Sequence, residues 1–227
     1  MTRSHARRDL MSNELLDRAA TLFAERGFAG TTLQEIADVM GISRPALYHY
    51  ISSKEELLSQ LVQGITKTTA DAMTELRSDD ARPADERLHD AILDMTRRIA
   101  SNPSRFKLLD RSEHNLSPED AEEHRTAKRR VLEELREIVR QGINEGLFRP
   151  VNDTVTAFAI LGMCNWVAWW FHPDTGELDA DELAEEFSRL VMDGLLSHGD
   201  SGEVSLQTAF RRLQEDVNLL ERVIETH

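Results

Sequence analysis

The stretch Thr31–Tyr50, TTLQEIADVMGISRPALYHY, decides how this chain folds, because its pattern predicts two short helices joined by a tight turn. A threonine at its start can cap the first helix with its hydroxyl oxygen. Gly41 follows, where a left-handed backbone ends that helix and turns the chain sharply. Ser43 can then cap a second helix, whose first turn contains Pro45. The stretch therefore predicts a helix-turn-helix.

The second helix of this motif is predicted to present a polar outer face. Leu47 and Tyr50 point back to the core, so the other side chains face outward. A face that combines a cation, an aromatic hydroxyl and an imidazole suits a DNA groove and the phosphates beside it. Lys54, in the first turn of the next helix, is assigned to a backbone phosphate. The candidate DNA-binding residues are Thr31, Thr32, Ser43, Arg44, Pro45, Tyr48, His49 and Lys54.

The flanking segments extend the motif into a family pattern. LLDRAATLFAERGFAGTT precedes the turn and SSKEELLSQLV follows it. Together they resemble the DNA-binding domain of TetR-family transcriptional regulators, with Ile51 in place of the usual aromatic residue. The resemblance implies a homodimer that binds a double-stranded DNA operator and responds to a small-molecule effector. The matching residues are Ala20, Phe23, Gly27, Thr31, Thr32, Ile36, Ala37, Gly41, Ser43, Leu47, Tyr48, Tyr50, Lys54, Glu55 and Leu57.

The whole chain is predicted to be all-α. Its 227 residues exceed one average domain, and strand signals are nearly absent. We expect a DNA-binding helix-turn-helix domain of three helices over residues 1–53, and a helical ligand-binding and dimerisation domain over residues 54–198. Residues 199–227 contain a linker and an additional helix, predicted from about Ser205 to Glu225 because apolar residues repeat there at heptad spacing. We expect the apolar side of that helix to pack on protein.

The basic segment TRSHARR precedes a first helix predicted over about Asp9–Arg26. Such an arm can follow DNA phosphates or enter a minor groove. A disordered tail is an equally good interpretation, and the sequence favours neither.

Charge is distributed unevenly along the chain. The net charge is −14, from 27 basic and 41 acidic residues. Residues 1–50 carry as many basic as acidic side chains, so the excess belongs to the remainder, which DNA would repel. The single cysteine, Cys164, excludes an intrachain disulfide and fits a reducing cytoplasm, and the start of the chain does not have the pattern of a signal peptide.

The most apolar segment, residues 154–171, contains no charged residue. Acidic helices surround it, so burial between its own lobe and a partner subunit is favoured over a membrane span. In TetR-family proteins, this helix and the next one from each subunit form a four-helix dimer interface. The resemblance therefore implies that the helices predicted over Asp153–His172 and Asp181–Ser197 carry the dimer contact.

Three tryptophans on the apolar segment and two basic clusters raise the possibility of a ligand site. The rings can line an apolar cavity, or can simply fill the core and the dimer contact. The clusters, within residues 97–111 and 124–130, can bind an anion or can form an ordinary solvated surface paired with glutamates. An apolar cavity beside cations suits an acyl-coenzyme A, and NWVAWWFHP resembles regulators of lipid and steroid catabolism, some of which respond to acyl-CoAs. The candidate ligand-binding residues are Arg105, Arg125, Asn165, Trp166, Trp169 and Trp170.

No catalytic residue, metal site or cofactor is predicted, because the eight histidines are scattered and no glycine-rich phosphate loop occurs. The leading function is a dimeric repressor that a ligand releases from DNA. A constitutive DNA-binding protein would lack an internal cavity. A helical enzyme is the third alternative, and the absence of a nucleophile–base pair argues against it.

Overall fold

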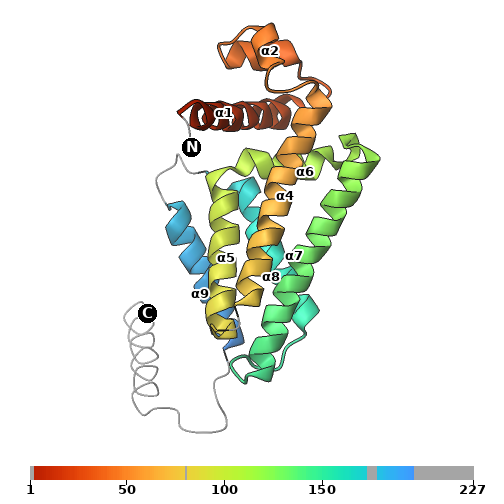
Figure 1. Cartoon of the computed structure of the whole chain (residues 1–227). Helices are drawn as coiled ribbons and strands as arrows, with labels where there is room; N and C mark the ends of the chain where they lie inside the picture. The colour runs from red at the N-terminus through yellow and green to blue at the C-terminus, as the bar shows by residue number, and fades with distance from the viewer. Residues whose placement is uncertain (1–2, 80, 173–177, 197–227) are drawn as a thin grey trace, which may run out of the picture.

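The computed structural model describes residues 3–79, 81–172 and 178–196, and every regular element named within these ranges is a helix. Figure 1 shows two lobes, with a small one at the top and a bundle below it. The all-α prediction is confirmed. The elements are α1 (Arg3–Arg26), α2 (Leu33–Val39), α3 (Arg44–Leu47), α4 (Lys54–Ser78), α5 (Ala84–Ser101), α6 (Pro103–Ser112), the 3₁₀ helix η1 (Glu113–Asn115), α7 (Pro118–Asn144), α8 (Asp153–Trp170) and α9 (Ala180–Leu195).

The predicted helix-turn-helix is confirmed in α2 and α3. Gly41 adopts φ +65° between them, in the left-handed region that glycine favours. Ser43 caps α3 by accepting a hydrogen bond from the backbone N–H of Ala46. The buried core of this lobe includes Leu15 and Phe23 of α1, Ile36 of α2 and Leu47 of α3. The motif is therefore held against α1 by apolar side chains.

The first helix is longer than the sequence suggested. The prediction placed its start near Asp9, but α1 begins at Arg3. No glycine or proline interrupts residues 3–12, and alanine and arginine favour helix, so the basic segment continues the helix. Residues 3–8 therefore continue α1 and form neither the separate arm nor the disordered tail that the sequence left open, and their contact with DNA stays a prediction.

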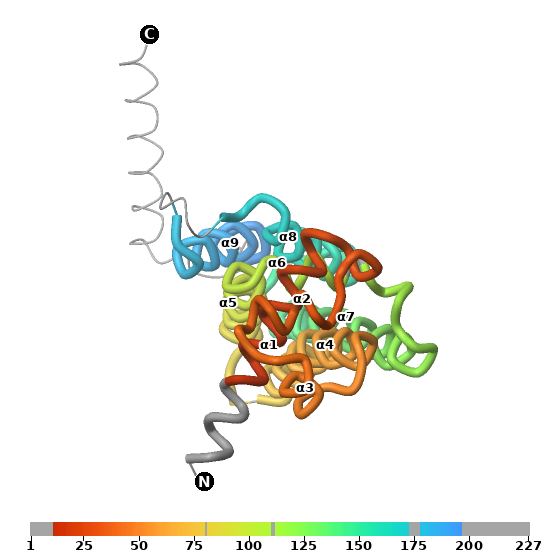
Figure 2. Tube along the Cα trace, turned by 90° about the horizontal axis from the view of Figure 1, so that it is seen from above, coloured from red at the N-terminus to blue at the C-terminus, as the bar shows by residue number. Residues whose placement is uncertain are grey.

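Helix α4 connects the lobes (Figure 1). Its first half contributes Leu57, Leu58, Leu61 and Val62 to the core of the small lobe, and its second half enters the bundle core from Ala70 onward. Seen from above in Figure 2, α4, α5, α7 and α8 lie below α1–α3. Helix α4 packs mainly on α7, and α5 packs mainly on α9.

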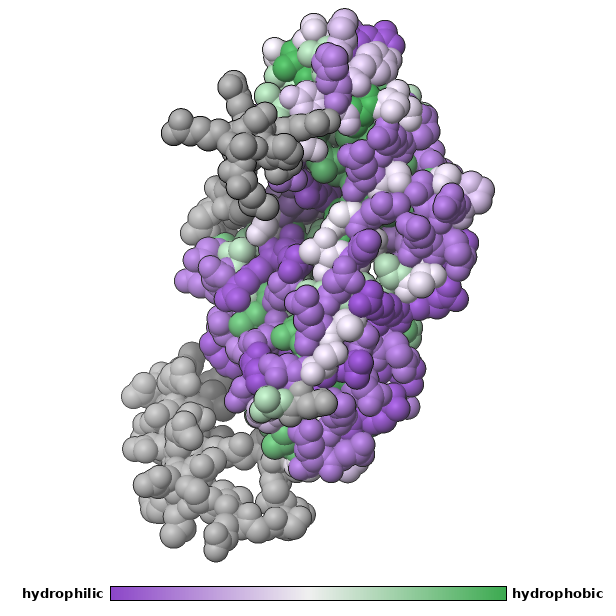
Figure 3. Space-filling model, in the orientation of Figure 1, coloured by the Kyte–Doolittle hydropathy of each residue, from purple (hydrophilic) through white to green (hydrophobic). Residues whose placement is uncertain are grey.

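The face of the bundle in Figure 3 is mostly hydrophilic, with small hydrophobic areas between charged residues. None of the helices in the described ranges has the length and hydropathy needed to cross a bilayer. The additional helix predicted over Ser205–Glu225 lies outside the described residues.

Candidate DNA-binding surface and ligand cavity

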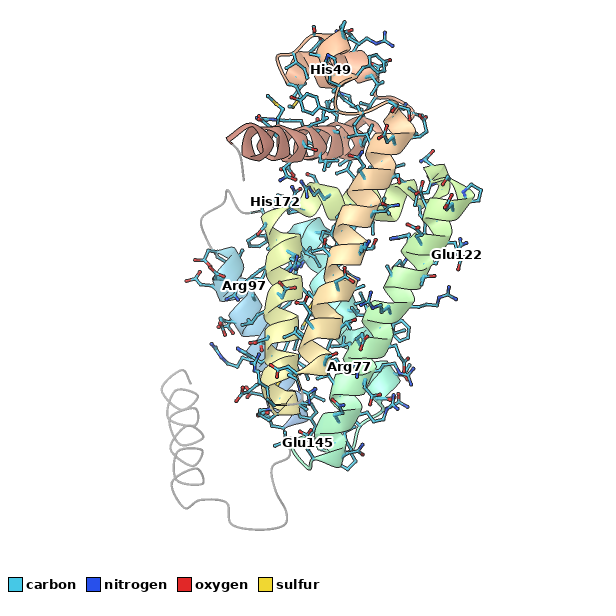
Figure 4. All side chains as sticks on the ribbon, in the orientation of Figure 1. His49, Arg77, Arg97, Glu122, Glu145 and His172 are labelled. Carbon is cyan, nitrogen blue, oxygen red and sulfur yellow. The ribbon has the colours of Figure 1, made fainter. Side chains whose placement is uncertain are left out.

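The outer face of α3 carries most of the predicted DNA-binding residues. Ser43, Arg44, Pro45, Tyr48 and His49 are all exposed, and His49 lies at the tip of the small lobe in Figure 4. Arg44 donates a hydrogen bond from Nη2 to the hydroxyl of Tyr48 at 3.2 Å, and its guanidinium carbon lies 5.8 Å from the centre of that ring. The two side chains therefore form one polar and aromatic surface.

Thr32 and Thr31 have different roles. The hydroxyl of Thr32 accepts from the backbone N–H of Glu35 at 3.2 Å, and the Glu35 carboxylate accepts from the backbone N–H of Thr32 at 2.8 Å. Hydrogen bonds from Thr32 lower the pKa of Glu35. Thr31 is only 1% exposed, and its hydroxyl donates to the carbonyl oxygens of Gly27 at 3.0 Å and Leu22 at 3.3 Å. The Thr31 side chain is therefore buried and does not belong to the DNA-facing surface.

Lys54 is engaged inside the protein. Its ammonium donates to the carbonyl oxygens of Phe28 at 2.7 Å and Thr31 at 2.9 Å, and lies 4.5 Å from the centre of the Phe28 ring. These contacts tie the start of α4 to the loop that precedes α2. Lys54 therefore has a structural role in positioning the motif, and its phosphate contact stays a prediction.

A cavity of about 500 Å³ lies in the bundle, between α4, α5, α6, α7 and α8. Most of its walls are apolar, and Asn165 and Trp169 of the predicted ligand set lie on α8 among them. Helix α6 forms one wall and packs against α1, and α4 forms another wall and continues into the small lobe, so two helices connect the cavity to that lobe. Its apolar walls include Ile65, Met95, Phe106, Leu132 and Phe158.

The other four predicted ligand residues do not line this cavity. Arg105 pairs with Asp17 and Arg125 with Glu122. Trp166 and Trp170 are 62% and 44% exposed. A helix turns about 100° per residue, so the face of α8 that carries Trp169 and Asn165 cannot also direct Trp166 and Trp170 inward.

Charged residues also line the cavity, and they are not the basic residues of the predicted ligand set. The cations that line the cavity are Arg98, Lys128 and Arg129, accompanied by Glu113 and His124. The histidine and the three cations all belong to the predicted basic clusters, but none of them was in the predicted ligand set. The sequence contained one signal for these lining residues: His124 and Lys128 are four residues apart, which puts them on one face of a helix.

His124 is 2% exposed and faces Glu113, with 3.9 Å between its Nε2 and the carboxylate Oε2. Lys128 approaches the same oxygen, at 3.3 Å. Burial lowers the pKa of His124, and the Lys128 charge lowers it further, against the opposing effect of Glu113. The imidazole is therefore neutral at neutral pH.

Exposed apolar side chains gather on α8 and α9. Val155, Phe158 and Trp166 of α8 are 66%, 57% and 62% exposed, and Leu190 of α9 is 67% exposed. Large apolar residues at this exposure on adjacent helices are typical of a surface that another protein covers.

Neither metal nor thiol chemistry is suggested by the described residues. No group of three His, Cys, Asp or Glu side chains within the described ranges is arranged to hold a metal ion. Burial raises the pKa of Cys164 to about 11, which suppresses the reactive thiolate.

Both lobes match known families. Residues 15–61 match the family described as bacterial regulatory proteins, tetR family, and residues 81–195 match the tetracyclin repressor-like, C-terminal domain. The HTH-type transcriptional repressor KstR2 of Mycobacterium tuberculosis is 30% identical over 203 residues, which cover 82% of this chain and 93% of that protein.

Solved structures agree with these matches. The ketosteroid transcriptional regulator KstR2 of Mycobacterium tuberculosis superposes with a TM-score of 0.73 at 26% identity, covering 82% of this chain and 95% of that one. The TetR-family regulator PfmR of Thermus thermophilus gives 0.70 at 33% identity, covering 79% and 97%. AibR in complex with isovaleryl coenzyme A and operator DNA gives 0.63 at 29% identity, covering 79% and 97%. The chain belongs to the TetR family of bacterial transcriptional regulators.

Proposed function

We propose that this protein is a homodimeric repressor that binds a double-stranded DNA operator through α2 and α3 and leaves it when an acyl-coenzyme A occupies the bundle cavity. Binding to chromosomal DNA would place its action in the cytoplasm. The observation that carries the proposal is a cavity of about 500 Å³ whose walls are mostly apolar and whose lining includes the cations Arg98, Lys128 and Arg129. Ligand pockets of roughly 300–1,000 Å³ with mostly apolar walls and few polar groups are common.

The shape of the cavity suits the two halves of such a ligand. Phe106, Phe158 and Trp169 offer apolar surface to an acyl group. Lys128 and Arg129 are 54% and 70% exposed at its edge, where the phosphates of the coenzyme would receive charge-assisted hydrogen bonds. The complex of AibR with isovaleryl coenzyme A and operator DNA supports this ligand class in a related fold.

Release of DNA requires that the ligand bind two arrangements of the lobes unequally. Helix α6 is the candidate connection, because it supplies Phe106 and Leu109 to the cavity and packs on α1. In a dimer held through α8 and α9, the two motifs would enter successive major grooves about 34–36 Å apart. A ligand that favours another separation would weaken binding to both half-sites.

The test begins with DNA fragments captured by the purified protein and identified by sequencing. The resulting operator complex is then titrated at fixed salt with acyl-CoAs of increasing length, the matching free acids and an uncharged hydrophobe. We expect thioesters to release the DNA at the lowest concentrations. Release by the uncharged compound with no response to any thioester would contradict the ligand assignment, and capture of DNA without sequence preference would contradict the repressor.

A further inference from the structure

We infer that Glu113 and Glu122 are specificity-determining residues, which make the cavity reject free carboxylic acids and accept polyanionic thioesters. The inference rests on the proposed function and concerns charged side chains of η1 and α7 that line the cavity or pair with its lining. We call this set the cavity mouth. Three of its members, Glu113, Lys128 and Arg129, line the cavity. The other two lie just outside the lining: Glu122 pairs with Arg129, and Arg125 pairs with Glu122.

Every cation of the cavity mouth already has a carboxylate partner. Lys128 Nζ lies 3.3 Å from Glu113 Oε2. Arg125 and Arg129 both contact Glu122, at 2.6 Å and 3.0 Å between nitrogen and oxygen. Figure 4 shows Glu122 on the outer side of α7. Hydrogen bonding and charge from Arg125, followed by the charge of Arg129, lower the pKa of Glu122, so it remains ionised at neutral pH.

Arg98, which lines the cavity together with Lys128 and Arg129, also has a carboxylate partner. Arg98 Nε lies 2.5 Å from Asp94 Oδ2, one turn away on α5. The buried His124 is neutral and adds no positive charge. An acid that enters the cavity therefore meets cations that are already paired.

A free acid gains little from this arrangement. Its single carboxylate can only replace another carboxylate on Lys128 or Arg129, and until it does so it is repelled by Glu113 and Glu122. In a coenzyme A thioester, the carboxylate of the free acid has become an uncharged thioester, and the coenzyme adds several phosphate charges. These phosphates can displace both glutamates at small cost, since the existing pairs are exposed and such pairs are weak.

The discriminating variants are Glu113→Gln and Glu122→Gln in the full-length protein. Glu133→Gln is the matched control, because Glu133 contacts Arg136 and Arg140 of α7 at the same three- and seven-residue spacing as Glu122 contacts Arg125 and Arg129, yet neither of its partners lines the cavity. Glu113→Asp keeps the charge and serves as the rescue variant. Dissociation constants are measured for decanoate and decanoyl-CoA, and for palmitate and palmitoyl-CoA, by titration calorimetry.

We expect each Gln variant to bind the free acids severalfold more tightly, since one repelling charge is removed. Binding of the thioesters should change less, so the preference for thioester over acid falls. Glu133→Gln and Glu113→Asp should keep the wild-type preference. If thioesters bind and the preference is the same in all variants, this inference is wrong while the proposed function stands. If no thioester binds the wild-type protein, the proposed ligand class and this inference are both wrong.

Discussion

The carboxylate of Asp17 on α1 is paired with the guanidinium of Arg105 on α6, with 2.7 Å between Oδ1 and Nη2. Asn102, which caps α6, donates from Nδ2 to the same oxygen at 2.5 Å. The next residue after Arg105 is Phe106, which lines the cavity. One carboxylate of the small lobe therefore holds the N-terminal turn of the helix that forms a cavity wall.

Asp17→Ala should reduce the response to effector more than it reduces DNA binding. The pair is partly exposed, so its loss should cost at most about 1 kcal/mol of folding free energy. Loss of the link between α1 and α6 should raise the effector concentration needed for DNA release severalfold, within the usual coupling range of about 1–3 kcal/mol. Glu14→Ala, which removes a pair within α1, is the control. Equal effector responses in both variants would contradict the role of Asp17.

Lys54→Ala should destabilise the small lobe. Its ammonium makes two hydrogen bonds to backbone carbonyls, and hydrogen bonds to charged groups contribute roughly 1.5–3 kcal/mol each. A decrease in melting temperature of several degrees is expected. Lys67→Ala, an exposed position on the same helix, should melt as the wild type does. If Lys54→Ala melts as the wild type does and its DNA binding depends less on salt, the main role of Lys54 is the phosphate contact and not the structural one.

Arg44→Ala should weaken operator binding without changing the melting temperature. The side chain is exposed on α3 beside Tyr48, and an arginine that reads a base contributes roughly 1–3 kcal/mol of discrimination. Tyr48→Phe should have a smaller effect, because the ring stays and only the hydroxyl is lost. Arg140→Ala, on α7 of the bundle, is the control for loss of a positive charge. Operator affinity equal to wild type in a gel shift at fixed salt would remove Arg44 from the recognition surface.

The helix-turn-helix could be predicted from the sequence because its determinants are local. Thr32 and Glu35 are three residues apart and form a capping box, Gly41 supplies the left-handed turn, and Ser43 caps the helix that follows. Each interaction spans a few residues, so sequence spacing identifies it.

The roles of individual cations depend on tertiary contacts that spacing does not show. Lys54 binds the carbonyl of Phe28, which is 26 residues away. On α7, the choice of Lys128 and Arg129 over Arg125 follows from how α4 and α8 pack on that helix. The sequence indicates a basic helix face, but the rotation of the helix about its axis is set by the whole bundle.

Leu190→Glu and Val155→Glu should each convert a dimer into monomers. Both side chains are apolar and about two-thirds exposed on α8 and α9, where a charge would have to be buried in the dimer contact. Sedimentation or light scattering measures the mass, and operator affinity should fall with it. Val39→Glu, a similar change in the small lobe at 50% exposure, should leave the mass unchanged. A dimer that persists in both bundle variants would place the subunit contact elsewhere.

His124 should make stability fall as the solution becomes acidic. Burial depresses its pKa in the folded protein below the ordinary value of about 6.5. Below that value the unfolded chain binds a proton that the native protein does not yet bind, so the free energy of unfolding decreases from about pH 6.5 downward and is unaffected above it. His124→Gln should therefore show a smaller loss of melting temperature between pH 7.5 and 5.5 than the wild type. His49→Gln, at an exposed position, should keep the wild-type dependence. The same loss in His124→Gln as in wild type would show that this histidine takes no part in the acid response.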